Sequence, residues 1–325
     1  MLPQFSYIRP KTLADAVGHL RQDGAAVHAG GTDLLGCLRE RTMNVSKVVS
    51  ISGLSDLSGV SENTEGGLSI GALTTITEVS ENELIKKKYP GLAQAASEVA
   101  SPQLRNQGTI GGNLCQKPRC WYYRGEFHCL RKGGDTCYAI GGENQFHAIF
   151  GHEGICAITH PSDTAPMLAA LDARVRVEGP KGRRGIRVSE LHVPPGVDPT
   201  AETYLKPGEV ITAINIPAPG PGLYTSYRKV RARRSWDFAL SGVALALAMN
   251  GGKVTSGKVY LSGAAPVPWR SQATEQAILG KSLDEKTIQD ASRAVVEGAK
   301  PLSQNRYKLD LFTGTMAEEL EKAAG

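Results

Sequence analysis

Thiols are the most concentrated chemistry-bearing groups in this sequence of 325 residues. Five of the six cysteines fall between Cys115 and Cys156, whereas Cys37 stands alone. A chain without an export signal rarely uses such a cluster for disulfides, so metal binding is the favoured chemistry. We expect Cys37 to be a buried small side chain. The candidate metal ligands are Cys120, Cys129, Cys137 and Cys156.

The spacing of these four cysteines does not identify the metal. They are separated by 8, 7 and 18 intervening residues, without the C-x2–4-C pairs of structural zinc sites and without the tight spacing of ferredoxin clusters. Their density is the stronger indication, because this 37-residue stretch shows no helix or strand period and something must order it. The residues alone leave an iron–sulfur cluster, a zinc site and free or redox-active thiols open.

Paired glycines form the second group of candidate residues. Gly30-Gly31-Thr32-Asp33 follows a predicted strand, and Thr109-Ile110-Gly111-Gly112-Asn113 is a second tight glycine turn. Glycine permits positive φ and lets backbone N–H groups approach a phosphate. Asp33 would repel a diphosphate if it pointed inward, so we expect it to cap the next segment or to bind backbone. Neither loop matches G-x-G-x-x-G or the P-loop, which disfavours a Rossmann or nucleotide-triphosphatase site.

Short elements must position these loops. We expect a helix capped by Thr12, strands at residues 25–28, 47–51 and 68–73, and a helix capped by Thr74 or Thr75. Further helices are expected at residues 91–99 and 163–171, with a strand at 173–178. After two Pro/Gly-rich stretches at 194–199 and 217–222, the pattern changes to strands at 224–230 and 253–262, then helices at 274–279, 284–299 and 316–322. This is an α+β pattern.

Composition excludes several classes of protein. The net charge of +5 and the charged fraction of 21% are ordinary for a globular protein, and the short basic clusters are better interpreted as solvated faces than as nucleic-acid contacts. No apolar run reaches the ~18 residues of a membrane span. The N-terminus lacks a secretory signal, so we expect a cytoplasmic protein; export to the periplasm with a signal-bearing partner is compatible with this. We find no triad or metalloprotease motif, and we assign no catalytic residue.

The ordered set of motifs resembles one family. The motifs are Val27–Leu34, Leu104–Asn113, His160–Asp163, Gly208–Ile211 with Ile216-Pro217, and Lys229–Ala239. Together they resemble the FAD-binding medium subunit of the xanthine oxidase family of molybdenum hydroxylases. The resemblance implies an α+β fold with a two-part FAD-binding domain (PCMH type, similar to vanillyl-alcohol oxidase) at residues 1–216. A C-terminal α+β domain of sheet plus helices would follow at residues 217–325.

The resemblance also implies roles for individual residues. Two loops would wrap the FAD pyrophosphate through backbone N–H groups, Asp163 would touch the cofactor, Val99 would pack near the flavin, and Ile211 and Lys229 would line its ring system. Without the resemblance, Lys229 would be interpreted as an ordinary surface lysine. The first loop comprises Val27, His28, Ala29, Gly30, Gly31, Thr32, Asp33 and Leu34, and the second Thr109, Ile110, Gly111, Gly112 and Asn113.

Some members of this family carry an inserted [4Fe–4S] cluster, and residues of about 115–158 resemble that insert. The implied ligands are the four cysteines named above, while Cys115 would be buried near the flavin. Trp121, Tyr122 and Tyr123 would cover the cluster with apolar surface. A histidine such as His147 could replace a thiolate, but four thiolates make that unnecessary.

The resemblance implies an oxidoreductase subunit for electron transfer, of the xanthine dehydrogenase, aldehyde oxidoreductase or hydroxybenzoyl-CoA reductase type. A molybdopterin-containing large subunit and a [2Fe–2S] small subunit would complete a heterotrimer or a dimer of heterotrimers, which would exchange electrons with an external carrier. The alternatives are a stand-alone FAD-dependent oxidoreductase and a zinc-binding interaction module.

Overall fold

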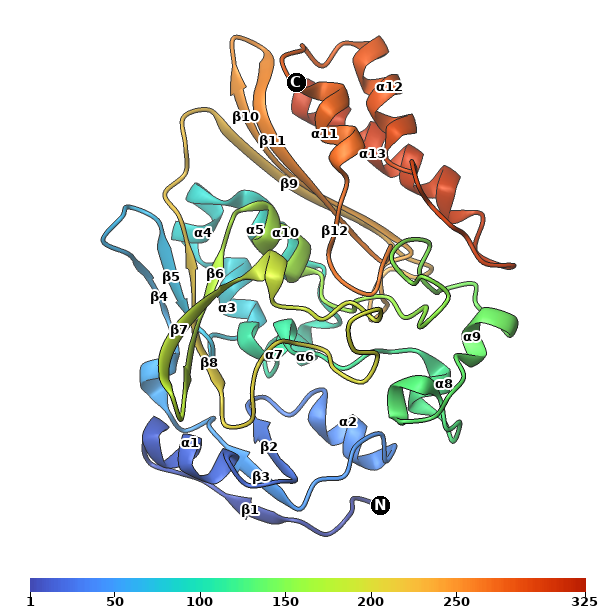
Figure 1. The fold of residues 1–325 in the computed structure, drawn as a ribbon. Helices are drawn as coiled ribbons and strands as arrows, with labels where there is room; N and C mark the ends of the chain where they lie inside the picture. The colour runs from blue at the N-terminus through green and yellow to red at the C-terminus, as the bar shows by residue number, and fades with distance from the viewer.

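The computed structural model describes residues 1–325, and its N-terminal part is a small parallel sheet (Figure 1). Its strands β1 (Ser6–Ile8), β2 (Ala25–His28) and β3 (Lys47–Ser50) are arranged in the order β1-β3-β2. Helix α1 (Leu13–Leu20) begins at Thr12, whose side chain accepts from the N–H of Asp15, as expected. Helix α2 (Leu34–Arg39) follows β2, so the first glycine motif connects a strand to a helix.

A second, antiparallel sheet completes the N-terminal half. Its strand order is β4-β5-β8-β6-β7, with strands β4 (Val60–Glu62), β5 (Leu68–Gly71), β6 (Arg174–Gly179), β7 (Gly182–Arg187) and β8 (Val210–Ile216). Short 3₁₀ turns η1 (Ser55–Leu57) and η3 (Val188–Glu190) lie at its connections. This sheet and the parallel sheet are the two parts of the expected FAD-binding fold.

Helices pack against the antiparallel sheet around one large core. They are α3 (Ile76–Glu81), α4 (Glu83–Lys88), α5 (Pro90–Ser97), α6 (Pro102–Arg105), α7 (Ile110–Leu114) and α10 (Thr164–Ala170). Thr75 forms a capping box with Glu78 at the start of α3, as one of the two expected caps. Fully buried Ile70, Leu92, Ile110 and Leu168 connect strands and helices in this core.

The cysteine-rich segment has little regular structure, as its aperiodic sequence indicates. It contains only α8 (Trp121–Arg124), η2 (Leu130–Lys132) and α9 (Tyr138–Gly141). Each of Cys120, Cys129 and Cys137 lies immediately before one of these short helices. The segment then packs onto the C-terminal part, where Ile149 and Phe150 join the core of that part.

The C-terminal part is a four-stranded antiparallel sheet covered by helices. Strands β9 (Leu223–Val230), β10 (Ser241–Asn250), β11 (Lys253–Ser262) and β12 (Trp269–Arg270) pair in sequence. Helices α11 (Gln272–Ile278), α12 (Glu285–Ala294) and α13 (Lys308–Ala324) lie on one side of the sheet, and α5 and α10 of the N-terminal half lie on the other (Figure 1). The alanine-rich stretch that ends at Asn250 forms the buried strand β10. Helix α13 is longer than the expected helix at 316–322.

A buried lysine fastens the cysteine-rich segment to α13. The Lys308 ammonium, fully buried at the start of this helix, donates to the carbonyl oxygens of Phe146, His147 and Gly263 at 3.3, 3.0 and 2.7 Å. Burial lowers the pKa of Lys308 to about 7. None of the helices is both long and apolar enough to traverse a bilayer.

Candidate functional site

A cavity of about 790 Å³ lies between the two glycine loops. Its volume is within the usual range for a cofactor pocket. Of the residues expected at the flavin, fourteen line it: Val27, Ala29, Gly30, Gly31, Thr32, Asp33, Leu34, Val99, Thr109, Gly111, Gly112, Asn113, Asp163 and Ile211.

Three expected residues lie behind the wall of this cavity. His28 points to the neighbouring strand and its Nδ1 pairs with Ser50 Oγ at 3.1 Å. Ile110 is fully buried in the main core. Lys229 is also fully buried and contacts the wall residue Asp163 instead of the open space. The side chains of these three residues therefore do not line the cavity.

The first glycine loop presents a row of free backbone donors. The N–H groups of residues 30–34 donate to no acceptor in the protein. Gly31 has a φ of +73°, and a Cβ on Gly30 would lie 1.8 Å from the carbonyl oxygen of Gln107. The two glycines thus allow a tight turn pressed against the second loop, and its free amides form a binding site for a phosphate anion.

The second loop has a different conformation from the one expected. The segment Thr109–Asn113 is not an open turn, because Thr109 caps the short helix α7 and accepts from the N–H of Gly112 at 3.2 Å. The N–H groups of Ile110 and Gly111 donate to the carbonyl oxygens of Thr74 and Ala72, both at 2.9 Å. The amides of Ile110, Gly111, Gly112 and Asn113 are thus already paired. The row of free donors belongs to the first loop.

Asn113 joins the second loop to the start of α10. Its Oδ1 accepts from the hydroxyls of Ser162 and Thr164 at 2.5 and 2.6 Å, and all three side chains are buried. Asp163 lies between these two residues and faces the cavity. The position of Asp163 therefore depends on the second loop.

The carboxylate of Asp163 is held by two buried donors. Lys229 Nζ lies 2.8 Å from Oδ2, and the Tyr227 hydroxyl donates to Oδ1 at 2.8 Å. Lys229 Nζ also donates to the carbonyl oxygen of Glu98 at 3.0 Å. Burial raises the pKa of Asp163, and the attraction of Lys229 opposes that rise. The pair thus places at the wall of the cavity a carboxylate whose charge is balanced by the buried ammonium of Lys229.

Asp33 faces cations instead of the free amides beside it. Its Oδ1 lies 2.8 Å from both Arg119 and Arg124, and its Oδ2 accepts from the N–H of Lys117 at 2.8 Å. It makes no cap hydrogen bond to α2, so of the two expected roles only the backbone contact is found. This carboxylate connects the first loop to the beginning of the cysteine-rich segment.

The four candidate metal ligands line a second, small cavity. Cys120, Cys129, Cys137 and Cys156 surround it together with Tyr122, Tyr123, Arg131 and His147. Trp121, the third aromatic residue expected at this cavity, does not line it but packs edge-on against His147 with ring centroids 5.2 Å apart. His147 Nε2 lies 3.2 Å from Cys120 Sγ. The structure thus collects in one place four thiols that are spread over the sequence.

Backbone donors and burial set the acidity of these thiols. Burial raises the pKa of Cys120 to about 11, against hydrogen bonds from the N–H groups of Tyr123 and Tyr122. A hydrogen bond with Cys156 lowers the pKa of Cys137 to about 6, and the same bond, with burial, raises that of Cys156. The thiols of Cys137 and Cys156 therefore contact each other, and no three His, Cys, Asp or Glu side chains converge on a common point for a metal ion.

The comparison with known proteins agrees with this arrangement of sites. Residues 3–219 match the family described as the FAD binding domain in molybdopterin dehydrogenase, and residues 225–320 match the C-terminal domain of the CO dehydrogenase flavoprotein. The aldehyde oxidoreductase FAD-binding subunit PaoB of Escherichia coli K12 is 37% identical over 98% of both chains. The chain belongs to the FAD-binding medium subunits of the xanthine oxidase family.

Other medium subunits share the whole fold. The medium chain of the carbon monoxide dehydrogenase of Hydrogenophaga pseudoflava is 27% identical over 99% of this chain and 96% of its own. A solved structure of carbon monoxide dehydrogenase from the same organism superposes with a TM-score of 0.78 at 26% identity, covering 100% of this chain and 99% of that one. This FAD-binding subunit is therefore part of an oxidoreductase complex.

Several residues at the FAD cavity of this medium subunit escaped the sequence analysis. They come from segments remote in sequence and include Lys117, Arg119, Glu202, Glu209, Trp236 and Phe238, which line the cavity together with Cys115. Only Cys115 was expected near the flavin, and its burial raises its pKa to about 12. The sequence names Trp236 only within the motif Lys229–Ala239. In the structure its side chain is exposed and its φ is +54°, in the left-handed region that non-glycine residues rarely adopt.

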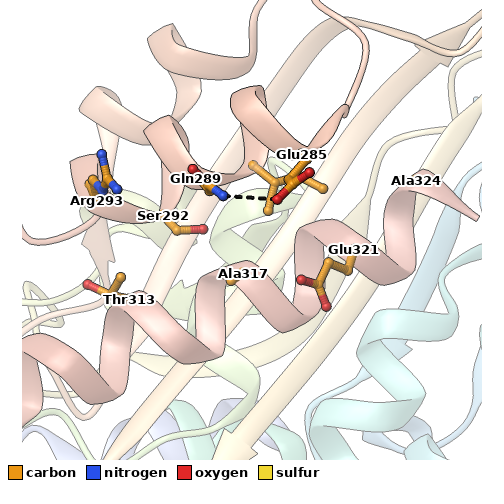
Figure 2. A pocket seen from close by; sticks show the side chains of 9 residues that line it. Glu285, Gln289, Ser292, Arg293, Thr313, Ala317, Glu321 and Ala324 are labelled. Carbon is orange, nitrogen blue, oxygen red and sulfur yellow. Dashed lines mark hydrogen bonds between the residues drawn. The ribbon is translucent and has the colours of Figure 1, made fainter.

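A third hollow, of about 450 Å³, lies between α12 and α13 of this medium subunit (Figure 2). Gln289 donates to Glu285 at 3.3 Å along one side of it, and Glu321 lies on the other helix. The hollow contains no glycine loop and no cysteine, and it shares no lining residue with the FAD cavity. It plays no part in the cofactor sites described above.

Proposed function

We propose that this subunit carries both FAD and a [4Fe–4S] cluster and transfers electrons within a heterotrimeric molybdenum hydroxylase. One observation carries the proposal: Arg119 lines the FAD cavity, and the next residue, Cys120, lines the cysteine cavity. A single peptide bond thus connects the walls of the two sites. Groups held this close are suited to exchange electrons without any residue acting as an acid, base or nucleophile.

The residues at the first cavity fit FAD. The free amides of residues 30–34 would bind the pyrophosphate, since they form a continuous row of unpaired donors. The Asp163–Lys229 pair would hold a polar group of the cofactor, and Val99 and Ile211 would supply apolar wall for the ring. Bound FAD takes up two electrons and can release them one at a time.

The residues at the second cavity fit an iron–sulfur cluster. Four thiols are available, and the N–H groups of Tyr122 and Tyr123 donate to Cys120 while those of Ala139 and Ile140 donate to Cys137. Such donors stabilise thiolate sulfur and are a usual feature of these clusters. Buried Arg131 Nε and His147 Nδ1 have no partner in the protein. The contact between Cys137 and Cys156 must open to admit the cluster.

Membership of this family supports a proposal about the partner subunits. We propose a molybdopterin-containing large subunit, a [2Fe–2S] small subunit and an external electron carrier, in a heterotrimer or a dimer of heterotrimers.

Residues 1–216 form the FAD-binding domain with its cysteine insert at about 115–158, and residues 217–325 form the C-terminal domain. The complex acts in the cytoplasm or travels to the periplasm with a partner that carries the signal.

Metal analysis of anaerobically purified protein tests the proposal. We expect about four irons per chain, flavin absorbance and co-purification with two other polypeptides. Zinc without iron would contradict the cluster. A colourless protein would contradict bound FAD, and a monomer that oxidises a substrate alone would indicate a stand-alone flavoenzyme.

A pair of matched variants localises the cluster. Cys137→Ser should lose iron and retain FAD, because no cysteine ligand supplies a free amide to the flavin site. Cys37→Ser, which changes a buried thiol at the FAD cavity, should retain the iron. Equal iron content in the two variants would show that the four-cysteine assignment is wrong.

A further inference from the structure

Arg131 is the cation of the cysteine cavity. It lies in η2, two residues after Cys129, and its side chain is only 3% exposed. It lines the cavity with the four cysteines. A buried guanidinium among thiols needs compensating partners, because an unpaired buried charge is costly.

The end of the guanidinium is fixed by three acceptors. Arg131 Nη1 donates to the carbonyl oxygen of Pro199 at 2.8 Å, and Nη2 donates to that of Ala201 at 2.8 Å and to Glu202 Oε1 at 3.1 Å. The remaining nitrogen, Nε, is buried and has no acceptor in the protein. The side chain is therefore held rigidly with one unused N–H donor.

Glu202 connects this arginine to the other cofactor site. It lines the FAD cavity, and its second carboxylate oxygen contacts the ammonium of Lys117, which lines the same cavity. Arg131 and Glu202 are thus an ion pair whose members belong to two different cavities. The cation lies on the cysteine side and the carboxylate on the FAD side.

We propose that Arg131 sets the reduction potential of the cluster, by donating its Nε–H to a cluster sulfur and by holding a fixed positive charge beside it. The inference rests on the [4Fe–4S] cluster of the proposed function. With four thiolates, the cluster carries a charge of −2 when oxidised and −3 after it accepts one electron, and no proton needs to move. A nearby cation stabilises the −3 state more than the −2 state and raises the potential.

Glu202 moderates this effect. Its carboxylate fixes Arg131 and partly neutralises the positive charge that the cluster experiences. Removing the arginine charge and removing the glutamate charge should therefore move the cluster potential in opposite directions. A role of Arg131 in packing alone would not produce opposite signs.

A redox titration of the purified complex tests the role of Arg131. The titration monitors the cluster by its low-temperature EPR signal, which is the signal absent from the Cys137→Ser variant. We expect Arg131→Gln to lower the reduced-to-oxidised ratio at a fixed potential about tenfold, which is about 59 mV for a one-electron couple. Glu202→Gln should raise the ratio. Arg228→Gln removes the same charge from an exposed pair with Glu318, and should change the ratio less than twofold.

Iron and FAD content of each variant separate the outcomes. Unchanged potentials in Arg131→Gln and Glu202→Gln with full iron, or shifts of the same sign, would overturn the inference. If Arg131→Gln does not retain iron, Arg131→Lys replaces it, because lysine keeps the charge but lacks the Nε–H donor. The inference would also be overturned if the cluster potential were unchanged in Arg131→Lys and in Glu202→Gln. Wild-type protein without iron would instead refute the cluster of the proposed function.

Discussion

Asp33 Oδ1 and Arg124 Nη2 lie 2.8 Å apart, and this contact joins the first glycine loop to the helix that follows Cys120. Asp33 is the residue directly after the loop's Gly-Gly-Thr, while Arg124 lies 91 residues later. Because the same carboxylate oxygen also contacts Arg119, one side chain holds an arginine on each side of Cys120 in the sequence. The cysteine-rich segment is thus attached to the flavin loop and is not an independent appendage.

Replacing this carboxylate should affect both stability and FAD binding. We expect Asp33→Asn to lower the free energy of unfolding by about 2 kcal/mol, because buried Arg124 and half-buried Arg119 lose a shared carboxylate, and to reduce the FAD content of purified protein. Denaturant titration and absorbance near 450 nm measure these effects. Glu40→Gln removes only the more exposed partner of Arg124, and should cost less than about 1 kcal/mol.

The contact between the loops makes Gly30 intolerant of any side chain. A Cβ at this position would lie 1.8 Å from the carbonyl oxygen of Gln107, so Gly30→Ala must push the loops apart at a cost of ~2 kcal/mol, and we expect loss of FAD. The control is Gly18→Ala in α1, where a Cβ has open space and should stabilise the helix by ~0.5–1 kcal/mol. Retention of FAD by Gly30→Ala would refute the role of this loop.

The ion pair behind the cavity wall should depend on both of its members. Lys229→Met leaves the buried carboxylate of Asp163 without its cation, and we expect a loss of ~3 kcal/mol in stability together with weaker FAD binding. The double variant Asp163→Asn/Lys229→Met should be more stable than Lys229→Met alone, since it removes the unpaired charge. A double-mutant cycle by denaturant titration measures the coupling, and additive effects would contradict it.

Acid should destabilise the protein through His192. This ring is fully buried and donates from Nε2 to the carbonyl oxygen of Leu114 at 2.9 Å, and burial lowers its pKa to about 4. An unfolded histidine titrates near 6.5, so the unfolded state binds the extra proton between pH 6.5 and 4, and stability falls as pH falls through this window. From pH 7 to pH 5 we expect a loss of ~1.5 kcal/mol from this residue. In His192→Gln the slope of stability against pH should be smaller; an equal slope would exclude His192 as its source.

Much of the fold could be predicted from local signals. Thr12 and Thr75 cap helices because their hydroxyls accept the first free N–H groups, and Gly30-Gly31 turns where only glycine avoids a clash. The burial of Lys229 was not expected, although β9 alternates and places it on the same face as Thr225 and Tyr227. The alternation of β9 thus indicates that Lys229 faces inward, but a lysine is exposed far more often than it is buried.

The rest of the candidate site depends on contacts between remote residues. The sequence separates Arg131 from Glu202 by 71 positions, and no spacing rule relates an arginine after a cysteine to a glutamate in a later loop. The same holds for Asn113, whose hydrogen bonds to Ser162 and Thr164 become visible only once α7 and α10 are packed. Pairing of the amides in the second loop also depended on its tertiary contacts with Ala72 and Thr74.

The lysine at the start of α13 has a consequence for biosynthesis. Lys308 comes after all four cysteines in the chain, yet its ammonium holds the carbonyl oxygens of Phe146 and His147 beside them. A chain emerging from the ribosome with its N-terminus first therefore exposes all four thiols long before this anchor exists. The anchor that fixes the backbone of Phe146 and His147 beside the cysteine cavity therefore forms only after all four cysteines have been synthesised.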